Sequence, residues 1–327
     1  MMRLNQASKS GSTRRNNSKK ARYKLDNWRE YNESLVKRGS ITLWISEEDI
    51  SAWKPGDSKK RGGQFQYTDG AIECMVMVRS VFRLTLRATE GFVRSVFELI
   101  EVELTVPDYT TICRRAKFLE VSLPKKAKGP LHAVLDSTGL KVFGEGEWKV
   151  RQHGYTKRRT WRKLHLGVDS ATHEIQAVVL SEASRDDAGA VPDLLDQIGE
   201  AVEQLSADGA YDKRKVYTAC SERGIKRVSI PPRKDARIWQ HGNCVAPPLV
   251  RDENLRRIRK IGRKKWKRES GYHQRSLAET AIYRFKTIFG SHLQARRLPQ
   301  QQTEALVKCA ALNKMTQLGM PESYRVE

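Results

Sequence analysis

Near its C-terminal end the chain reads Gly271-Tyr-His-Gln-Arg-Ser-Leu-Ala-Glu-Thr-Ala-Ile-Tyr-Arg-Phe-Lys286. Drawn as an α-helix at about 100° per residue, this stretch places four polar residues in one stripe about 60° wide, namely Tyr272, Arg275, Glu279 and Lys286. Apolar residues form an adjacent arc that faces a core: Leu277, Ala278, Ala281, Ile282, Phe285, Ile288 and Phe289. A carboxylate between two cations and a phenol indicates a site on a rigid helix, although a solvated charge ladder has the same spacing.

Two further carboxylates interrupt apolar strands. Asp136 follows Ala-Val-Leu in a strand expected over residues 131–143, and Asp208 closes a strand expected over residues 204–208. A charge inside a strand is costly unless something compensates it. If these strands are neighbours and the helix with Glu279 packs across them, the three carboxylates converge. Such oxygen donors would hold one or two Mg²⁺ or Mn²⁺ ions for phosphoryl transfer, whereas each aspartate alone could simply cap or turn the chain.

The second half of the chain alternates strands and helices. Strands are expected over residues 131–143, 161–168, 174–180, 204–208 and 226–230, with helices over 188–202 and 213–223. Three antiparallel strands extended by crossover-connected parallel ones follow the order of an RNase H-like domain. The expected fold class is therefore α/β, with a mixed five-stranded sheet and helices in a catalytic domain over residues 125–295.

Three smaller features complete this half. Residues 233–270 are expected to be an irregular basic insert, and residues 296–327 a helical C-terminal tail. Asp212 is expected to cap the helix that follows it, with a position behind a metal ligand as the alternative.

The first half is expected to be a basic arm followed by a helical DNA-binding domain. Residues 1–21 are rich in Ser, Asn, Lys and Arg and predict disorder. Residues 22–124 predict helices over 26–38, 69–84, 89–103 and 107–119, a short strand over 41–45, and a linker over 122–130. The last two helices suit a helix-turn-helix-like segment whose second helix carries Thr110, Thr111, Arg114 and Arg115 outward. An ordinary three-helix bundle is the alternative.

Composition favours nucleic acid as the partner. The 327-residue chain has a net charge of +23 and a pI near 9.9, with basic residues along its whole length. Such a field attracts a polyanion. A membrane surface would compete, but the sequence has no apolar run near 18 residues and no signal-peptide core, so we expect no membrane partner. Its five cysteines are dispersed without a C-x-x-C pair, which argues against disulfides and thiolate zinc. We expect no organic cofactor.

The spacing Tyr272-x2-Arg275-x3-Glu279-x6-Lys286 resembles the Y-R-E-K motif of the DDE transposases of bacterial insertion sequences. Asp136 and Asp208 stand where that family has its first and second aspartate. Three other stretches resemble the IS-five-type group in particular: Asn27-Trp-x-x-Tyr31, Pro107-Asp-Tyr-Thr-Thr111 and Trp161-Arg-Lys-Leu-His165.

The resemblance implies roles for these residues. Asp136, Asp208 and Glu279 would be the catalytic metal ligands, for two Mg²⁺ or Mn²⁺ ions in the manner of two-metal sites. Arg275 and Lys286 would contact DNA phosphates near the cleaved bond, and Tyr272 would pack on the terminal nucleotides.

Other candidate DNA contacts are weaker. Trp266 and Trp239 lie amid basic residues, where related enzymes stack a flipped base, but a buried insert core explains them equally well. The basic residues Arg158, Arg159 and Lys163 suit phosphate contacts or a solvated loop.

The resemblance also implies a function. A transposase would bind double-stranded DNA, both terminal inverted repeats and target, and would cleave and join strands as a dimer on DNA. Its place would be the bacterial cytoplasm, on the nucleoid. Two alternatives remain: an RNase H-like nuclease without strand transfer, which would not need the helical N-terminal domain, and a non-catalytic DNA-binding protein derived from a transposase.

Overall fold

The computed structural model describes residues 22–56, 62–123, 130–142, 161–198, 202–240 and 248–326. The expected basic arm over residues 1–21 lies outside the described residues, as do the candidate DNA contacts Arg158 and Arg159. Among the described helices, none is both long enough and apolar enough to cross a membrane.

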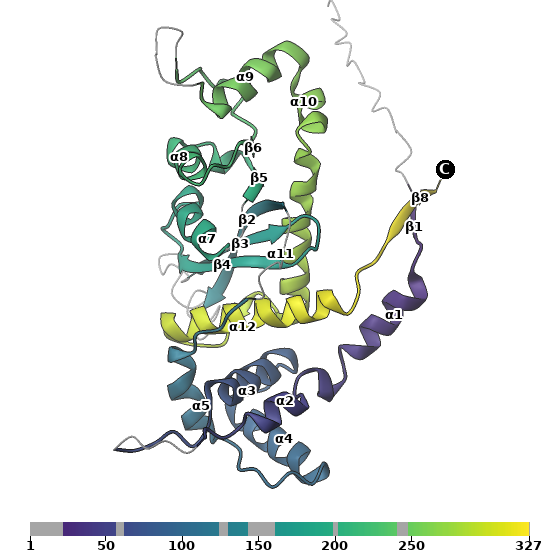
Figure 1. The fold of residues 1–327 in the computed structure, drawn as a ribbon, viewed down its shortest axis with the longest axis vertical. Coiled ribbons are helices and arrows are strands. Elements are labelled where there is room, and N and C mark those ends of the chain that lie inside the picture. Colours follow the sequence, from purple (N-terminus) through teal and green to yellow (C-terminus); the bar gives the residue numbers. More distant parts are fainter. Residues whose placement is uncertain are drawn as a thin grey trace, which may run out of the picture.

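A mixed sheet forms the centre of the fold (Figure 1). Its order is β4-β3-β2-β5-β6, and the short β7 pairs with the end of β2. The strands β2, β3 and β4 form an antiparallel meander, whereas β5 and β6 continue the sheet in parallel. This order confirms the expected five-stranded RNase H-like arrangement. The strands are β2 (Leu131–Val142), β3 (Trp161–Asp169), β4 (Ile175–Glu182), β5 (Val202–Ser206), β6 (Arg227–Ser229) and β7 (His292–Leu293).

Helices cover both faces of this sheet. One face packs against α7 (Val191–Gln197) and α8 (Arg214–Glu222), and the other against α11 (Ser276–Phe289) and α12 (Leu298–Gln317). Because side chains alternate along a strand, β2 contributes to both layers. Its residues Val134 and Leu140 join the cluster with α11 and α12, while Leu131, Ala133 and Leu135 join the cluster with α7 and α8.

The N-terminal helices share a core with α11, α12 and the face of the sheet that these two helices cover. Buried side chains of α3 and α4 belong to the same apolar cluster as those of α11, α12 and one face of the sheet. Figure 1 shows α12 lying between the sheet and these helices. The elements are α1 (Trp28–Lys37), η1 (Ile41–Leu43), α2 (Glu47–Ser51), α3 (Asp69–Val81), α4 (Leu86–Leu99), α5 (Tyr109–Arg115) and η2 (Ala116–Phe118).

The two ends of the described chain pair with each other. The strands β1 (Arg22–Leu25) and β8 (Ser323–Val326) form a separate antiparallel ribbon. The Asn27 side chain reinforces it, since its amide donates to the Met320 carbonyl at 2.9 Å and its oxygen accepts from the Glu322 amide at 2.8 Å. The ribbon and α1 stand beside the body of the molecule (Figure 1).

Two local predictions are wrong. Residues 41–45 form no strand: Ile41–Leu43 are the 3₁₀ turn η1, and the consecutive Trp44 and Ile45 are both buried, whereas a strand would point them to opposite faces. The helix predicted over 188–202 is shorter. It consists of η3 (Asp187–Ala190) and α7, with Ile198 already extended and Val202 beginning β5.

The prediction of an irregular insert over residues 233–270 is wrong for residues 250–269, whereas residues 233–240 contain no helix or strand. Residues 250–269 form α9 (Val250–Ile261) and α10 (Arg263–Glu269), separated by Gly262 at φ 82°. Leu255, Ile258 and Trp266 bury the inner side of this helix pair. The i, i+3 spacing of Leu255 and Ile258 was the available signal, but the surrounding run of Lys and Arg masks it.

A buried ion pair attaches α9 to the connection between η4 (Gly209–Tyr211) and α8. Arg251 Nε donates to Asp212 Oδ1 at 2.7 Å and Arg251 Nη2 to Asp212 Oδ2 at 3.2 Å. The side chains are only 4% exposed for Arg251 and 5% exposed for Asp212. The Tyr217 hydroxyl donates to the same carboxylate, and the Trp239 ring lies 3.7 Å from the guanidinium carbon. Asp212 is therefore a clamp for the insert and caps no helix: the N-cap of α8 is Lys213, without a side-chain cap.

This clamp predicts a large loss of stability when it is broken. Asp212→Ala is expected to lower the free energy of unfolding by about 3 kcal/mol, because it removes the two-pronged partner of the buried Arg251 and leaves only the 3.3 Å contact with Asp252. Urea denaturation followed by circular dichroism measures the change. As a control, Asp196→Ala breaks the exposed pair with Arg223 and should cost no more than about 1 kcal/mol. Similar small losses in both variants would contradict the clamp.

Candidate active site

The parallel pairing of β2 with β5 brings the first two carboxylates together. Val134 lies opposite Ser206 in the register, so two residues further on Asp136 lies level with Asp208. Asp136 remains within β2 and its side chain is only 14% exposed. Asp208 follows the end of β5, where its Oδ1 accepts from the Ala210 amide at 2.8 Å and caps η4 (Gly209–Tyr211).

The third carboxylate comes from α11. Glu279 lies exposed in the first turn of this helix. Arg275 connects it to the strand: Arg275 Nη1 is 2.6 Å from Glu279 Oε1, and Arg275 Nη2 is 3.4 Å from Asp136 Oδ2. One guanidinium thus joins a carboxylate of the sheet to a carboxylate of the helix.

The helix expected to begin at Tyr272 starts four residues later. Gly271 is left-handed at φ 66°, residues Tyr272–Arg275 form the 3₁₀ turn η5, and α11 begins at Ser276. The expected stripe therefore runs over two elements. The Arg275–Glu279 pair keeps its i, i+4 geometry across the junction. These two residues of the expected stripe are therefore in contact, even though the helix is shorter than predicted.

The charges around Asp136 act on one another. Burial raises the pKa of Asp136 above its ordinary range; the Ser137 amide and Arg275 oppose this, and the charges of Asp208 and Glu279 add to it. Burial also raises the pKa of the Tyr272 phenol, on which Arg275, Asp208 and Glu279 act as well. The structure therefore gathers the three carboxylates, Arg275 and Tyr272 into one electrostatic neighbourhood.

The donor set fits a hard divalent cation in its chemistry. All three carboxylates offer oxygen, the donor that Mg²⁺ and Mn²⁺ prefer. A cation would offset both the burial and the acidic neighbours that raise the pKa of Asp136. As placed, however, no three Asp, Glu, His or Cys side chains of the described residues surround a common point as metal ligands. Glu279 is turned to Arg275 instead.

Comparison with protein families identifies the chain. Two family models described as a transposase DDE domain match it, over residues 36–145 and 127–314. The second match covers more than half of the 327 residues. The chain belongs to the DDE transposase family. It is therefore a DNA-cleaving, strand-transferring enzyme, as the Y-R-E-K spacing led us to expect.

Two solved structures are distantly similar to this DDE transposase. One is the piggyBac transposase in a synaptic complex with hairpin DNA, at 12% identity over 86% of this chain and 73% of that chain, with a TM-score of 0.38. The other is the Drosophila P element transposase in a strand transfer complex, at 11% identity over 79% of this chain and 82% of that chain, with a TM-score of 0.28.

The two candidate DNA-binding arginines of the N-terminal helices differ in exposure. Arg114 is exposed, but Arg115 is only 13% exposed and bonds to Asp69 and to the Tyr67 carbonyl. The expected outward orientation of Arg115 is therefore wrong. The connection between α4 and α5 spans residues 100–108, which is longer than the three- or four-residue turn of a helix-turn-helix.

Two other candidate DNA contacts are also engaged within the transposase. Trp266 is 2% exposed, donates from Nε1 to Asn254 at 3.2 Å and lies against the Tyr272 ring. This burial leaves no free face for a flipped base and supports the insert-core explanation. Lys163 lies 3.3 Å from Asp187 and donates to the Arg185 carbonyl at 3.0 Å. Lys286 is half-buried and makes no ion pair with a described residue.

Sequence reasoning missed Asp187 and its partner Ser137. Ser137 directly follows Asp136, and its hydroxyl donates to Asp187 at 2.6 Å. The position of Asp187 shortly after β4 was a weak signal, because an aspartate after a strand more often caps or turns the chain.

The carboxylates differ in exposure, since Asp136 is largely buried within β2 and Glu279 is exposed in the first turn of α11. A cavity of about 400 Å³ lies elsewhere, between the N-terminal helices and α12, where Trp44, Glu73 and Lys314 line part of it.

Proposed function

We propose that Asp136, Asp208 and Glu279 are the catalytic carboxylates of this transposase and hold two Mg²⁺ or Mn²⁺ ions. The observation that carries the proposal is the contact chain from Asp136 through Arg275 to Glu279, beside Asp208 in the paired strand. Two such ions, when bound, activate the attacking oxygen and stabilise the leaving oxygen of a phosphodiester.

The neighbouring side chains would hold the DNA. Arg275 presents a planar guanidinium at the carboxylates, and such a group binds phosphate through paired hydrogen bonds. Lys286 follows Glu279 by two helical turns, about 10 Å along α11, and its ammonium suits a phosphate further along the same strand. Tyr272, half-buried beside Arg275, would pack on the terminal nucleotides.

The substrate we propose is double-stranded DNA at two kinds of sequence. The transposase would recognise the terminal inverted repeats of an IS-five-type insertion sequence and join them to target DNA. Bringing two ends together calls for a dimer on DNA, and a bacterial origin would place the protein in the cytoplasm, on the nucleoid. Arg114, exposed on α5, remains the candidate for repeat recognition in the N-terminal helices.

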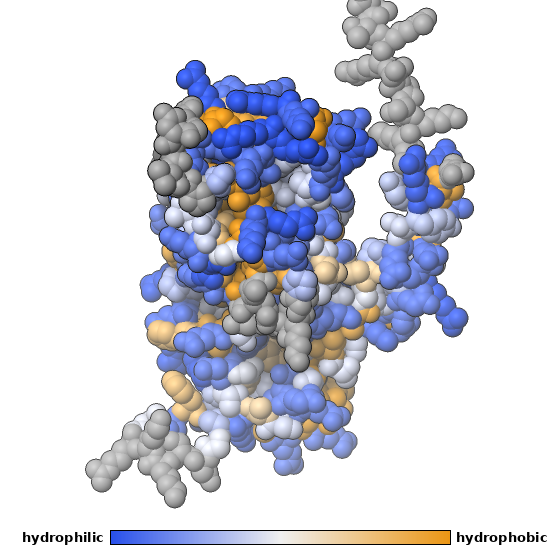
Figure 2. All heavy atoms as spheres, turned by 45° about the horizontal axis from the view of Figure 1, so that its top comes forward, coloured by the Kyte–Doolittle hydropathy of each residue, from blue (hydrophilic) through white to orange (hydrophobic). Residues whose placement is uncertain are grey.

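The helix pair α9–α10 supplies a further phosphate-binding surface. Lys260, Lys264, Lys265 and Arg268 are exposed on it and form no ion pair with a described residue. Figure 2, which turns this end of the molecule forward, shows strongly hydrophilic side chains over it. The end of α10 leads directly into η5 and α11, so duplex held here would continue towards Arg275 and Glu279.

Removing either carboxylate at the ends of the contact chain should abolish the chemistry. Asp136→Asn and Glu279→Gln are expected to slow Mg²⁺-dependent cleavage and joining of terminal-repeat DNA by at least about 100-fold, because each removes a metal ligand worth several kcal/mol in the transition state. Gel assays of labelled terminal-repeat DNA measure cleavage and joining, and filter binding measures DNA affinity, which should be retained.

Unfolding can be separated from loss of chemistry. Because folding raises the pKa of Asp136, ionisation of this carboxyl destabilises the folded state at pH values above the ordinary pKa of an aspartate. The uncharged Asp136→Asn should therefore melt at the same temperature as the wild type or higher. Asp193→Asn and Glu253→Gln, exposed positions on α7 and α9, serve as matched controls and should remain active. Normal cleavage by Asp136→Asn would exclude the proposed site.

The basic helix pair predicts a change in salt dependence. Replacing Lys264, Lys265 and Arg268 by Ala should weaken DNA binding equally for repeat and unrelated sequences. The slope of log affinity against log salt should decrease in magnitude by roughly 0.9 for each phosphate that the variant no longer neutralises. Filter binding between about 50 and 200 mM salt, a range over which phosphate contacts change affinity strongly, measures this slope.

A matched control removes the same charge elsewhere. Arg223, Lys226 and Arg227 are exposed where α8 leads into β6. Arg227 pairs with Gln204 near the start of β5, so this surface lies towards the other end of that strand from Asp208. Replacement of the three residues by Ala should leave the slope close to that of the wild type. An equal decrease for both triple variants would show that net charge, and no particular surface, sets the affinity.

A further inference from the structure

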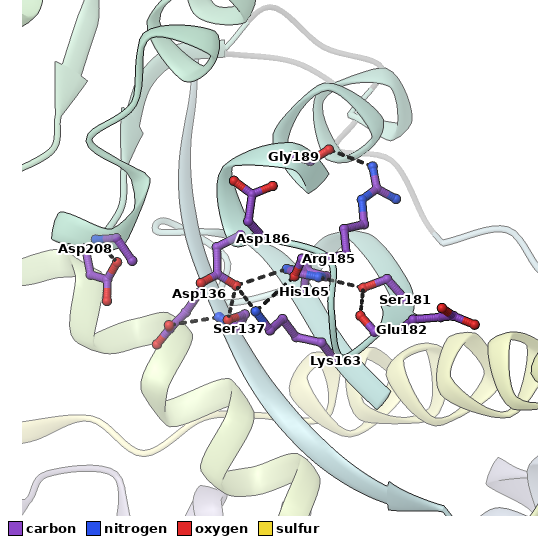
Figure 3. A network of polar contacts seen from close by, with 12 residues as sticks. Asp136, Ser137, Lys163, His165, Ser181, Glu182, Arg185, Asp186, Gly189 and Asp208 are labelled. Atoms are coloured by element: carbon purple, nitrogen blue, oxygen red, sulfur yellow. Dashed lines mark hydrogen bonds and ion pairs between the residues drawn. The ribbon is translucent and has the colours of Figure 1, made fainter. Parts of the chain in front are cut away.

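Behind the strand that carries Asp136 lies a polar network that the proposed reaction does not use (Figure 3). Asp187, the first residue of η3, accepts a hydrogen bond of 2.6 Å from the Ser137 hydroxyl. The same oxygen lies 3.3 Å from the Lys163 ammonium and 3.6 Å from His165 Nδ1. Asp187 thereby connects η3 to both β2 and β3.

This network lies on the opposite face of the sheet from Asp136. Successive side chains of a strand point to opposite faces: Asp136 reaches Arg275 on the α11 side, and Ser137 reaches Asp187 on the α7 side. The register places Ser137 opposite His165 and Gly139 opposite Lys163. The three side chains that contact Asp187 therefore leave the sheet on one face.

The charges of the network are nearly balanced. His165 is fully buried, and burial lowers its pKa to about 4, so the imidazole is neutral near pH 7. Its Nε2 lies 3.0 Å from the Ser181 hydroxyl. Lys163 is then the cation that compensates Asp187 among the described residues. Since partly buried ion pairs seldom add net stability, position is the better explanation for this one.

Ser137 links the two faces. Its hydroxyl is held by Asp187, while its backbone amide donates to Asp136 Oδ1 at 2.8 Å. A rotation of the Ser137 peptide would move the Asp136 carboxylate on the α11 face of the sheet. The hydrogen bond of Ser137 with Asp187 on the α7 face resists that rotation. Partners that orient a metal ligand typically change metal affinity or activity by about 10–100-fold when removed.

We propose that Asp187 is a positioning residue for catalysis, which fixes Ser137 from behind the sheet and so presents the Asp136 carboxylate to the metal ions in one orientation. This inference rests on the proposed role of Asp136. Asp187 itself touches neither DNA nor metal in this role. It acts only through Ser137.

The test combines metal binding with kinetics on the full-length protein. Asp187→Asn keeps the size of the side chain but removes the charge that holds Lys163 and Ser137. We expect the Mg²⁺ concentration for half-maximal cleavage to rise about 10-fold or more, with the KM for terminal-repeat DNA unchanged. Titration calorimetry with Mn²⁺ alone, without DNA, should show a matching loss of affinity.

A double-mutant cycle tests whether the effect passes through Ser137. Ser137→Ala should reproduce the change of Asp187→Asn, and the double variant should be no worse than either single variant, because residues that act through one contact are not additive. Ser137→Thr keeps the hydroxyl and should restore the metal dependence. Additive effects of the two single variants would overturn the proposal.

Other outcomes separate this proposal from a structural role and from the proposed function. Asp196→Asn, an exposed position on α7, is the control and should be unaffected. If Asp187→Asn lowers the melting temperature and the amount of active enzyme but leaves the Mg²⁺ and Mn²⁺ dependence unchanged, Asp187 is only structural. If Asp136→Asn remains active, the proposed function fails. If Asp136→Asn is inactive while Asp187→Asn behaves as wild type, only this inference fails.

Discussion

The parallel pairing of β2 with β5 is the constraint on which the rest of the structure depends. A parallel pair cannot be closed by a tight turn, so the chain must pass through β3, β4, η3 and α7 before it returns beside β2. This connection places Asp208 level with Asp136 and places Asp187 behind the same strand. One topological requirement thereby brings together two of the three carboxylates and the residue that contacts Ser137.

A carboxylate on a strand buried on both faces carries a cost, and the fold compensates it locally. Asp136 receives the Ser137 amide and the Arg275 guanidinium, yet burial and its acidic neighbours still raise its pKa. A structure selected for stability alone would place an apolar side chain there. Retaining a carboxylate in this strand is the kind of trade-off between stability and activity that enzymes make. In the role that we propose for Asp136, bound cations would compensate its charge.

Much of this arrangement was readable from the sequence, and the misjudged side chains share a common cause. The strand order and the neighbourhood of Asp136, Asp208 and Glu279 followed from alternation, spacing and the Y-R-E-K pattern. Arg115 and Asp212 were misjudged because each looks like a surface or capping residue in its own segment. In the fold each is enclosed by a distant partner, Asp69 for Arg115 and Arg251 for Asp212. For Trp266 the sequence left a buried insert core and a base contact equally open, and its burial supports the first. The role proposed for Asp187 was equally hidden, since Ser137 lies 50 residues away.

The sequence by itself indicated the order of the strands, the three carboxylates and the basic character of the surface. The signals for these features are local, because periodicity, charge and motif spacing can be read along the chain. The tertiary structure alone decided which side chains are enclosed and what faces them. It turned Arg275 between Asp136 and Glu279, buried Arg251 on Asp212 and placed Asp187 behind Ser137. Burial and partnership depend on elements far apart in the chain, and only folding brings those elements into contact.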